Sequence, residues 1–306
     1  MKTKSTVLVA GRGVPVSHPD KIFYPKSGFT KAAVLDYYER IAPVLLPHLQ
    51  GRAITLKRYP DGVEGSFFYE KQCPSHAPDW IRTTKVGKSD GEVIDYCLLD
   101  DLPSLLWAAN LANLEIHPFL HRASAPARPA ALVFDLDPGP PAGVLKCAQV
   151  ALWIRDMFAG LGLVSLVKTS GSKGLQLIVP LNSRITYART KPFARAVAAA
   201  LAAQLPREVT DLMKKDLRTG KVFIDWSQND DKKTTVSVYS LRARPVPSVS
   251  TPITWEELET ALQKGDETRL VFLTDEVLKR VARDGDLFEQ ALTLQQTLPA
   301  AKLPAS

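Results

Sequence analysis

A short apolar segment that carries two aspartates constrains this chain most strongly. Residues 131–139 read Ala-Leu-Val-Phe-Asp-Leu-Asp-Pro-Gly, and an apolar run closed by a Pro-Gly pair predicts a β-strand. Side chains alternate along a strand, so Asp135 and Asp137 project from one face and Leu136 from the other. Two carboxylates roughly 7 Å apart repel each other unless a cation lies between them, and hard oxygen ligands suit Mg²⁺ or Mn²⁺. The alternative is an Asp pair that only forms turns at a strand end, and the motif alone does not separate the two.

The composition is typical of a globular protein with a core of its own. The 306 residues are 45% hydrophobic and 23% charged, and no apolar run approaches the ~20 residues of a membrane span. The apolar stretch at residues 7–10 is too short for a signal peptide, so we expect a cytoplasmic protein. The formal charge of +7 is compatible with a polyanionic partner but is not diagnostic of one.

The three cysteines, Cys73, Cys97 and Cys147, are widely spaced and show no C-x-x-C pattern. An odd number at such spacing argues against a zinc site and against a disulfide framework.

Apolar periodicity and turn residues predict a mixed α/β chain. Thr30 and Thr254 are expected as helix N-caps, with Glu257 completing a capping box. The predicted helices cover residues 31–49, 102–114, 144–161, 187–205, 254 onward, 275–281 and 287–294. The predicted strands cover residues 53–57, 66–70, 80–85, 93–98, 131–137, 164–168, 175–181 and 222–226. We expect a flexible leader over residues 1–14, a single domain over 15–296 and a disordered tail over 297–306.

Two further features bear groups that suit phosphate chemistry. Asp225 ends a third apolar strand, where a sheet would hold a metal ligand rigidly, although a salt-bridged edge residue is an equal alternative. Residues 170–174, Ser-Gly-Ser-Lys-Gly, form a loop with exposed N–H groups, two hydroxyls and one ammonium, which can cradle phosphate. It is not a Walker A loop, and such loops are commonly only turns. Downstream cations add to the pattern, although a solvated basic face is their commoner meaning: Lys232, Lys233, Arg242 and Arg244.

Together, three aspartates on strands, a phosphate-type loop and a basic chain favour two-metal phosphoryl or nucleotidyl transfer. A two-metal nuclease is disfavoured, because the chain lacks the additional histidines and acids expected near such a site.

Several motifs resemble a known family, the polymerase domain of bacterial ATP-dependent DNA ligase D within the archaeo-eukaryotic primase superfamily. The strongest matches are the segments at residues 134–138, 169–174 and 222–229, and further matches follow in order from His18-Pro19-Asp20-Lys21 to Thr254-Trp255-Glu256-Glu257. The resemblance covers about residues 15–295. It implies an α/β (α+β) primase-polymerase fold, with central β-sheets flanked by helices around an acidic catalytic cleft.

The resemblance also implies roles for residues at matching positions. Asp135, Asp137 and Asp225 would hold two divalent metal ions, Mn²⁺ or Mg²⁺. The implied nucleotide-binding residues are Ser170, Ser172, Lys173, Gln176, Arg242 and His117, the last near the sugar. Gln176 stands where the family usually has histidine, and glutamine can donate a hydrogen bond to phosphate but cannot become a cation.

For DNA, the resemblance implies that Lys21 and Lys31 grip a 5′-phosphate and that Phe68, near Lys71, stacks on the template base. Arg218 would help organise the site around the primer terminus. The implied DNA-binding residues are Lys21, Lys31, Arg58, Phe68, Lys71 and Arg218.

The implied function is template-directed addition of ribonucleotides or deoxyribonucleotides at DNA ends and gaps with a 5′-phosphate, during non-homologous end joining. The implied partners are Ku and a DNA ligase supplied in trans, at the nucleoid. Two alternatives stay open: a primase that starts strands de novo, and a DNA-end-binding module with weak catalysis.

Overall fold

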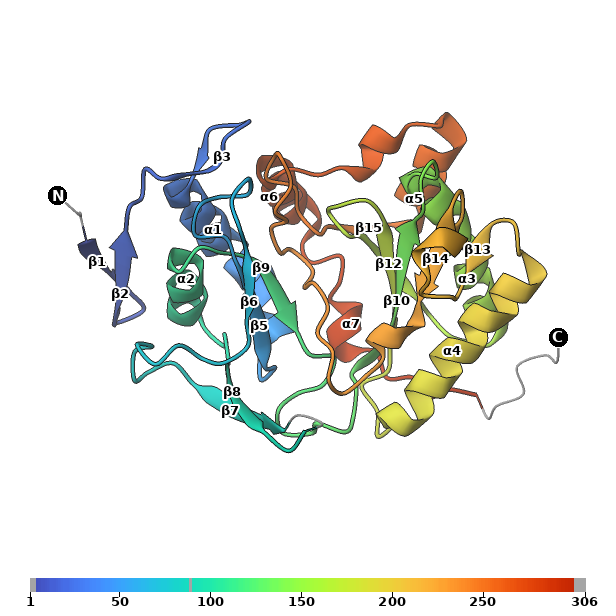
Figure 1. The fold of residues 1–306 in the computed structure, drawn as a ribbon, viewed down its shortest axis with the longest axis horizontal. Coiled ribbons are helices and arrows are strands. Elements are labelled where there is room, and N and C mark those ends of the chain that lie inside the picture. The colour runs from blue at the N-terminus through green and yellow to red at the C-terminus, as the bar shows by residue number, and fades with distance from the viewer. Residues whose placement is uncertain (1–3, 88–89, 300–306) are drawn as a thin grey trace. The chain divides into compact units, whose positions relative to one another are not determined.

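The computed structural model describes residues 4–87 and 90–299, and Figure 1 shows their mixed α/β fold. Contacts within the chain define two compact units, each assembled from segments far apart in sequence. The first unit contains residues 4–124, 234–250 and 273–286. The second unit contains residues 125–233, 251–272 and 287–299. The single domain expected over residues 15–296 stays a prediction.

The second unit is organised around a six-stranded sheet with the order β13-β14-β10-β12-β11-β15. All neighbouring strands are antiparallel except β13 and β14, which are parallel. Its central strand β10 carries the two aspartates, and the side chains of residues 132–134 and of Leu136 are fully buried. The strands are β10 (Ala131–Pro138), β11 (Leu166–Thr169), β12 (Leu175–Pro180), β13 (Val209–Thr210), β14 (Val222–Asp225) and β15 (Pro252–Ile253).

Helices pack against this sheet. The rings of Phe134 on β10 and Phe158 on α3 lie 5.5 Å apart, so α3 covers the sheet face opposite the aspartates. Thr254 and Glu257 form the capping box that the sequence predicts at the start of α5. The helices are α3 (Val144–Gly160), α4 (Tyr187–Gln204), α5 (Trp255–Lys264), α7 (Gln290–Thr293) and the 3-10 turns η1 (Lys215–Arg218), η2 (Trp226–Gln228) and η3 (Glu267–Leu270).

The first unit contains a three-stranded sheet with the order β6-β5-β9, three hairpins and three helices. Thr30 accepts a hydrogen bond from Ala33 N, which confirms it as the N-cap of α1. The sheet strands are β5 (Ile54–Arg58), β6 (Phe68–Glu70) and β9 (Asn113–Pro118). The hairpins are β1 (Lys4–Val9) with β2 (Arg12–Ser17), β3 (Ile22–Tyr24) with β4 (Phe29–Thr30), and β7 (Thr83–Gly87) with β8 (Val93–Cys97). The helices are α1 (Lys31–Leu49), α2 (Leu102–Asn110) and α6 (Thr274–Asp284).

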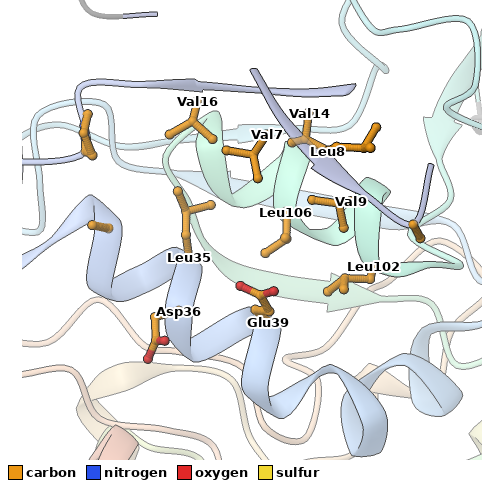
Figure 2. Close-up of a pocket in the computed structure, with 13 residues that line it drawn as sticks. Val7, Leu8, Val9, Val14, Val16, Leu35, Asp36, Glu39, Leu102 and Leu106 are labelled. Carbon is orange, nitrogen blue, oxygen red and sulfur yellow. The ribbon is translucent and has the colours of Figure 1, made fainter. Parts of the chain in front are cut away.

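The N-terminal segment differs from the flexible leader expected over residues 1–14. Residues 4–17 form the β1–β2 hairpin, in which Val9 and Val14 are buried. This hairpin lies over a cavity of about 440 Å³. The cavity wall includes Leu35 on α1 and Leu106 on α2, which Figure 2 shows beside the hairpin. The hairpin forms because its apolar side chains cover these two helices, a long-range contact that local sequence does not encode. Residues 1–3 of the expected leader lie outside the described residues.

The helix predicted over residues 102–114 is too long. Helix α2 ends at Asn110, and Ala112 adopts a left-handed backbone (φ 63°) from which the chain reverses into β9. Nearly every residue on both sides of this turn is buried. The sequence there has no alternation of polar and apolar residues, so its periodicity cannot locate the end of the helix.

The cysteines also correct an expectation. Cys73 and Cys97 form a disulfide, with their Cα atoms 5.1 Å apart, whereas the spacing argued against disulfides. The loop after β6 lies along β8, where Cys73 N donates to Asp95 O, and this pairing aligns the two thiols. Cys147 is free and buried.

The C-terminal end of the described chain is anchored at two residues. Gln296 donates to Pro180 O, and Leu298 is buried. Residues 300–306 of the expected tail lie outside the described residues. Within the described part of the chain, every helix is too short or too polar to cross a membrane.

Asn229, which follows η2, fastens this turn to the central strand. Its side-chain oxygen accepts from Val133 N at 2.9 Å, and its amide donates to Val133 O at 2.7 Å and to Trp226 O at 2.9 Å. The residue is fully buried, so each of these bonds forms away from water.

Asn229→Ala should therefore lower the free energy of unfolding by about 2 kcal/mol or more, because it leaves buried polar groups of β10 unsatisfied. Denaturant unfolding measures the change. Gln263→Ala, on the exposed side of α5, is the control and should change stability by less than ~0.5 kcal/mol. Equal stability of the two variants would contradict this role for Asn229.

Candidate active site

The three predicted metal aspartates lie on one face of the second unit's sheet. Asp135 and Asp137 share a face of β10, while Leu136 between them is completely buried on the other side, as the strand pattern predicts. Asp225, at the end of β14, is the cross-strand partner of Asp135. Cross-strand partners point to the same face of a sheet, so all three carboxylates share it.

The same register adds two side chains to this face. Gln176 on β12 is the cross-strand partner of Asp135, and Lys168 on β11 is the partner of Gln176. Asp225, Asp135, Gln176 and Lys168 thus form one line across four strands, which we call the polar row. Both Gln176 and Lys168 are 2% exposed.

Lys168 is a site residue that the sequence analysis does not identify. The available signal is a lysine inside the apolar strand Leu-Val-Lys-Thr, because lysine is rarely buried without an acidic neighbour. Its acidic neighbour is visible only once the strand order is known.

Burial and neighbouring charges perturb the ionisation of Asp135. Burial is the main cause that raises the pKa of its carboxyl to about 7, and the nearby carboxylates of Asp137 and Asp225 raise it further. The charge of Lys168 and a hydrogen bond from Gln176 act in the opposite direction. A bound cation would favour the ionised carboxylate, so this site is electrostatically suited to one.

Asp225 is held by its own turn. Its Oδ1 accepts from the backbone N (2.9 Å) and the hydroxyl of Ser227, and its Oδ2 accepts from Gln228 Nε2 at 2.8 Å. The ammonium of Lys233 in turn donates to the Ser227 hydroxyl. Ser227 and Gln228 therefore orient Asp225, a function that the sequence analysis does not assign to them.

The donor set fits a hard divalent cation chemically, since carboxylate oxygens accept more than one partner. In the geometry of residues 4–87 and 90–299, no three His, Cys, Asp or Glu side chains are arranged to hold a metal ion. To bind an ion, Asp225 would have to use the same carboxylate oxygens that accept hydrogen bonds from Ser227 and Gln228. The two-metal arrangement expected from the sequence therefore stays a prediction.

The 170–174 loop is seated directly on the aspartate strand. Ser170 Oγ accepts from Ser172 N and Gly174 N, both at 3.2 Å, so this hydroxyl closes the loop. Gly174 approaches β10 so closely that an added Cβ would lie 1.9 Å from Leu136 O. Ser172 and Lys173 are exposed on the loop that this contact fixes beside Asp135 and Asp137.

Arg218 is fixed beside the end of the same strand. An added Cβ on Gly139 would lie 1.9 Å from Arg218 O, so the backbones touch there. The guanidinium stacks 3.7 Å from the ring centroid of Phe223 and donates to Met213 O. The second unit thus brings together the aspartates, the loop, Gln176 and Arg218.

The other predicted site residues lie in the first unit. Lys31 is 4% exposed and donates to Ser17 O at 2.6 Å and Ser17 Oγ at 3.1 Å. Burial and the charge of Lys21 lower the pKa of Lys31 to about 8. Lys21 itself pairs with Asp61 at 3.0 Å. Lys21 and Lys31 are therefore close enough for their positive charges to repel each other.

Arg58 and Phe68 form a second group in this unit. The Arg58 guanidinium lies 5.1 Å from the Phe68 ring centroid and pairs with Glu70 at 2.7 Å. Phe68 is 43% exposed, and its neighbours Phe67 and Tyr69 are also exposed, so this edge presents aromatic faces to solvent. Lys71 follows directly and is exposed. Exposed rings beside a cation suit stacking on nucleic-acid bases.

His117 and Arg242 form a third group, joined by a carboxylate. Glu115 Oε2 lies 3.0 Å from His117 Nε2 and 3.4 Å from Arg242 Nε. The sequence analysis gives Glu115 no role. Its importance follows from the burial of an acid between an imidazole and a guanidinium.

Comparison with known proteins identifies the class of protein and its fold. A family model described as LigD, primase-polymerase domain, matches residues 30–288. The structure is similar to the polymerase domain from Mycobacterium tuberculosis ligase D in complex with DNA, with a TM-score of 0.84 and 41% identity. That similarity covers 92% of this chain and 98% of that chain. The resemblance and the α/β primase-polymerase fold expected from the sequence are confirmed.

Relatives found by sequence comparison indicate the same family. The multifunctional non-homologous end joining DNA repair protein LigD of M. tuberculosis is 42% identical over 285 residues, which cover 90% of this chain and 37% of that protein. The bifunctional non-homologous end joining protein LigD of Bacillus subtilis is 32% identical, covering 87% of this chain and 42% of that protein. This chain therefore belongs to the LigD primase-polymerase domain family, and it spans well under half the length of these relatives.

Gly174→Ala should destabilise the second unit by about 1–3 kcal/mol, because the new Cβ would collide with the backbone of β10. Thermal or denaturant unfolding measures the effect. Gly160→Ala is the matched control, since its Cβ would meet nothing within 4 Å. If Gly174→Ala were as stable as Gly160→Ala, the loop would not be seated as described.

The raised pKa of Asp135 predicts a pH dependence of stability in metal-free buffer. Between about pH 4 and 7 the unfolded chain ionises this carboxyl while the folded chain keeps its proton, so the folded state binds more protons. The stability that Asp135 contributes should therefore fall as pH rises through this window and level off above about pH 7. Unfolding free energies of wild type and Asp135→Asn, compared at each pH, measure it. Parallel curves for the two proteins would contradict the raised pKa.

Proposed function

We propose that this chain is a template-directed nucleotidyltransferase that adds ribonucleotides or deoxyribonucleotides to primer 3′ ends at DNA breaks and short gaps. The observation that carries this proposal is the acidic end of the polar row on β10 and β14, with the 170–174 loop seated beside it. Carboxylates next to exposed hydroxyl, ammonium and N–H groups are the combination that nucleotidyl transfer requires. Membership of the LigD primase-polymerase family supports the same reaction.

Each group in the second unit has a part in this proposal. Asp135, Asp137 and Asp225 would hold two divalent ions, Mg²⁺ or Mn²⁺. When bound, such ions activate the attacking oxygen and stabilise the leaving pyrophosphate. The loop residues Ser170, Ser172 and Lys173 would bind the triphosphate, with the exposed Lys173 supplying the positive charge. Gln176 donates to Asp135, so its contribution would be to the acid at least as much as to the nucleotide.

In the first unit, Arg242 and His117 would bind the nucleotide. The pair Lys21 and Lys31 would bind a 5′-phosphate, since two neighbouring ammonium groups repel each other until an anion lies between them. The exposed Phe68 would stack on a template base, with contacts to the DNA backbone from Arg58 and Lys71. Arg218, in the second unit, would help to organise the site around the primer terminus.

The relatives support a biological setting for this proposal. Their names describe non-homologous end joining proteins, and the solved M. tuberculosis domain is in complex with DNA. These names support a role in end joining; the partners that we propose are Ku and a DNA ligase, and the location that we propose is the cytoplasm at the nucleoid.

The proposal is tested by primer extension on gapped DNA that bears a 5′-phosphate, with each nucleotide type and with Mg²⁺ or Mn²⁺. Wild type should extend the primer according to the template. Asp137→Ala should lower the rate by at least about 100-fold, because it removes a metal carboxylate. Asp156→Ala, which removes an exposed aspartate on α3, is the control and should retain wild-type extension.

Other outcomes would favour the alternatives. A dinucleotide made from template and nucleotides without a primer would identify a primase. Binding to gapped DNA that depends on the 5′-phosphate, with no extension at any metal concentration, would leave a DNA-end-binding module and contradict the proposal.

A further inference from the structure

Glu115, on β9, is a buried acid to which the proposed function assigns no role. It is 2% exposed, and groups from three segments converge on its two oxygens. Its neighbours are Lys57 Nζ (3.4 Å) and Ala243 N (3.1 Å) at Oε1, and His117 Nε2 (3.0 Å) and Arg242 Nε (3.4 Å) at Oε2. Because all of them lie in the first unit, this geometry is internal to that unit.

The carboxyl stays ionised despite its burial. Burial alone raises the pKa of Glu115, but the hydrogen bond from His117 and the charges of Arg242, His117 and Lys57 outweigh it and hold the pKa well below its usual range. An ionised carboxylate can only accept hydrogen bonds. The 3.0 Å contact therefore requires that His117 Nε2 carry the proton and donate it.

The remaining ring nitrogen of His117 follows from this assignment. Burial lowers the pKa of His117, and although Glu115 raises it, Arg242 and Lys57 lower it further, so the ring is neutral near pH 7. A neutral ring with its proton on Nε2 has a lone pair on Nδ1. Nδ1 can then accept a hydrogen bond from a hydroxyl, and it cannot donate one to a phosphate oxygen.

We propose that Glu115 is a positioning residue for nucleotide binding, which fixes His117 as a hydrogen-bond acceptor and anchors Arg242 through its Nε. The donor that a nucleotide offers near its phosphates is a sugar hydroxyl, so one carboxylate sets up a hydroxyl acceptor and a phosphate-binding cation together. This inference rests on the proposed nucleotide-binding function of His117 and Arg242. It goes further by assigning their orientation to a third residue, Glu115.

The first test needs no catalysis. Nitrogen-15 NMR of the full chain labelled at its five histidines reports which ring nitrogen carries a proton, and loss of a signal in His117→Asn assigns His117. At pH 7.5 wild type should show the Nε2–H tautomer of a neutral ring. A proton on Nδ1 of His117, in either the neutral or the cationic ring, would overturn the proposal.

The second test compares Glu115→Gln with a matched control, Asp286→Asn. Asp286 is a partly buried carboxylate of the first unit; its Oδ2 lies 2.8 Å from His48 Nε2, and its Oδ1 accepts from Tyr239 OH at 2.7 Å. Glu115→Gln should weaken nucleotide binding and raise KM by about tenfold while kcat stays within about twofold, because orientation for binding is lost. Asp286→Asn should leave both constants unchanged.

Equilibrium binding of the nucleotide separates failure of this proposal from failure of the proposed function. If wild type binds nucleotide without extending a primer, the polymerase proposal fails. The effect of Glu115→Gln on nucleotide binding then still tests the positioning role of Glu115. The proposal is overturned if wild type binds no nucleotide. It is also overturned if folded Glu115→Gln binds like wild type, or if Asp286→Asn weakens binding as much. If Glu115→Gln does not fold, the tautomer of His117 in the wild-type protein tests the proposal instead.

Discussion

The second unit depends on the antiparallel register that places β10 between β14 and β12. This register lines up Asp225, Asp135, Gln176 and, one strand further, Lys168 on one face of the sheet. It brings carboxylates together in a poorly solvated place, and burial and the neighbouring carboxylates raise the pKa of Asp135. The opposite face of β10 compensates, because its apolar residues are completely buried against the helices of the unit. A stable strand thus carries an unfavourable group of charges that a cation would relieve.

The segments around this strand are attached to its backbone. Asn229 bonds to both polar groups of Val133, Gly174 touches Leu136 O, and Gly139 touches the backbone of Arg218. The glycines allow close backbone contact because they have no side chain, and the side-chain amide of Asn229 supplies hydrogen bonds. Each contact fixes a separate loop. In the first unit Glu115 acts in a comparable way, since one carboxylate holds side chains from β5, β9 and the segment after residue 234. In both units a few buried polar groups therefore determine where the exposed ones lie.

Most local features of the sequence were predicted correctly, and most long-range ones were not. The alternation of Asp135, Leu136 and Asp137 is a property of any strand, and the caps at Thr30 and Thr254 involve residues only three apart. The roles of Lys168 and Glu115 depend on neighbours from other strands, so no local pattern identifies them. The Cys73–Cys97 disulfide and the β1–β2 hairpin likewise arise from contacts between distant segments. The strand β9 was missed because nearly all of its residues are buried. Without exposed polar residues at regular spacing, the sequence pattern does not distinguish a strand from a helix.

The central claim is that the aspartates of β10 form a cation site. It is tested most directly by titrating Mn²⁺ into the protein without DNA or nucleotide and following the free ion by electron paramagnetic resonance. Wild type and Asp156→Asn, which alters an exposed aspartate on α3, should bind Mn²⁺ equally. Asp135→Asn and Asp137→Asn should each weaken binding by at least about tenfold, because each removes a charged oxygen ligand. Equal Mn²⁺ affinity in all four proteins would show that these carboxylates hold no metal ion, and would contradict this account.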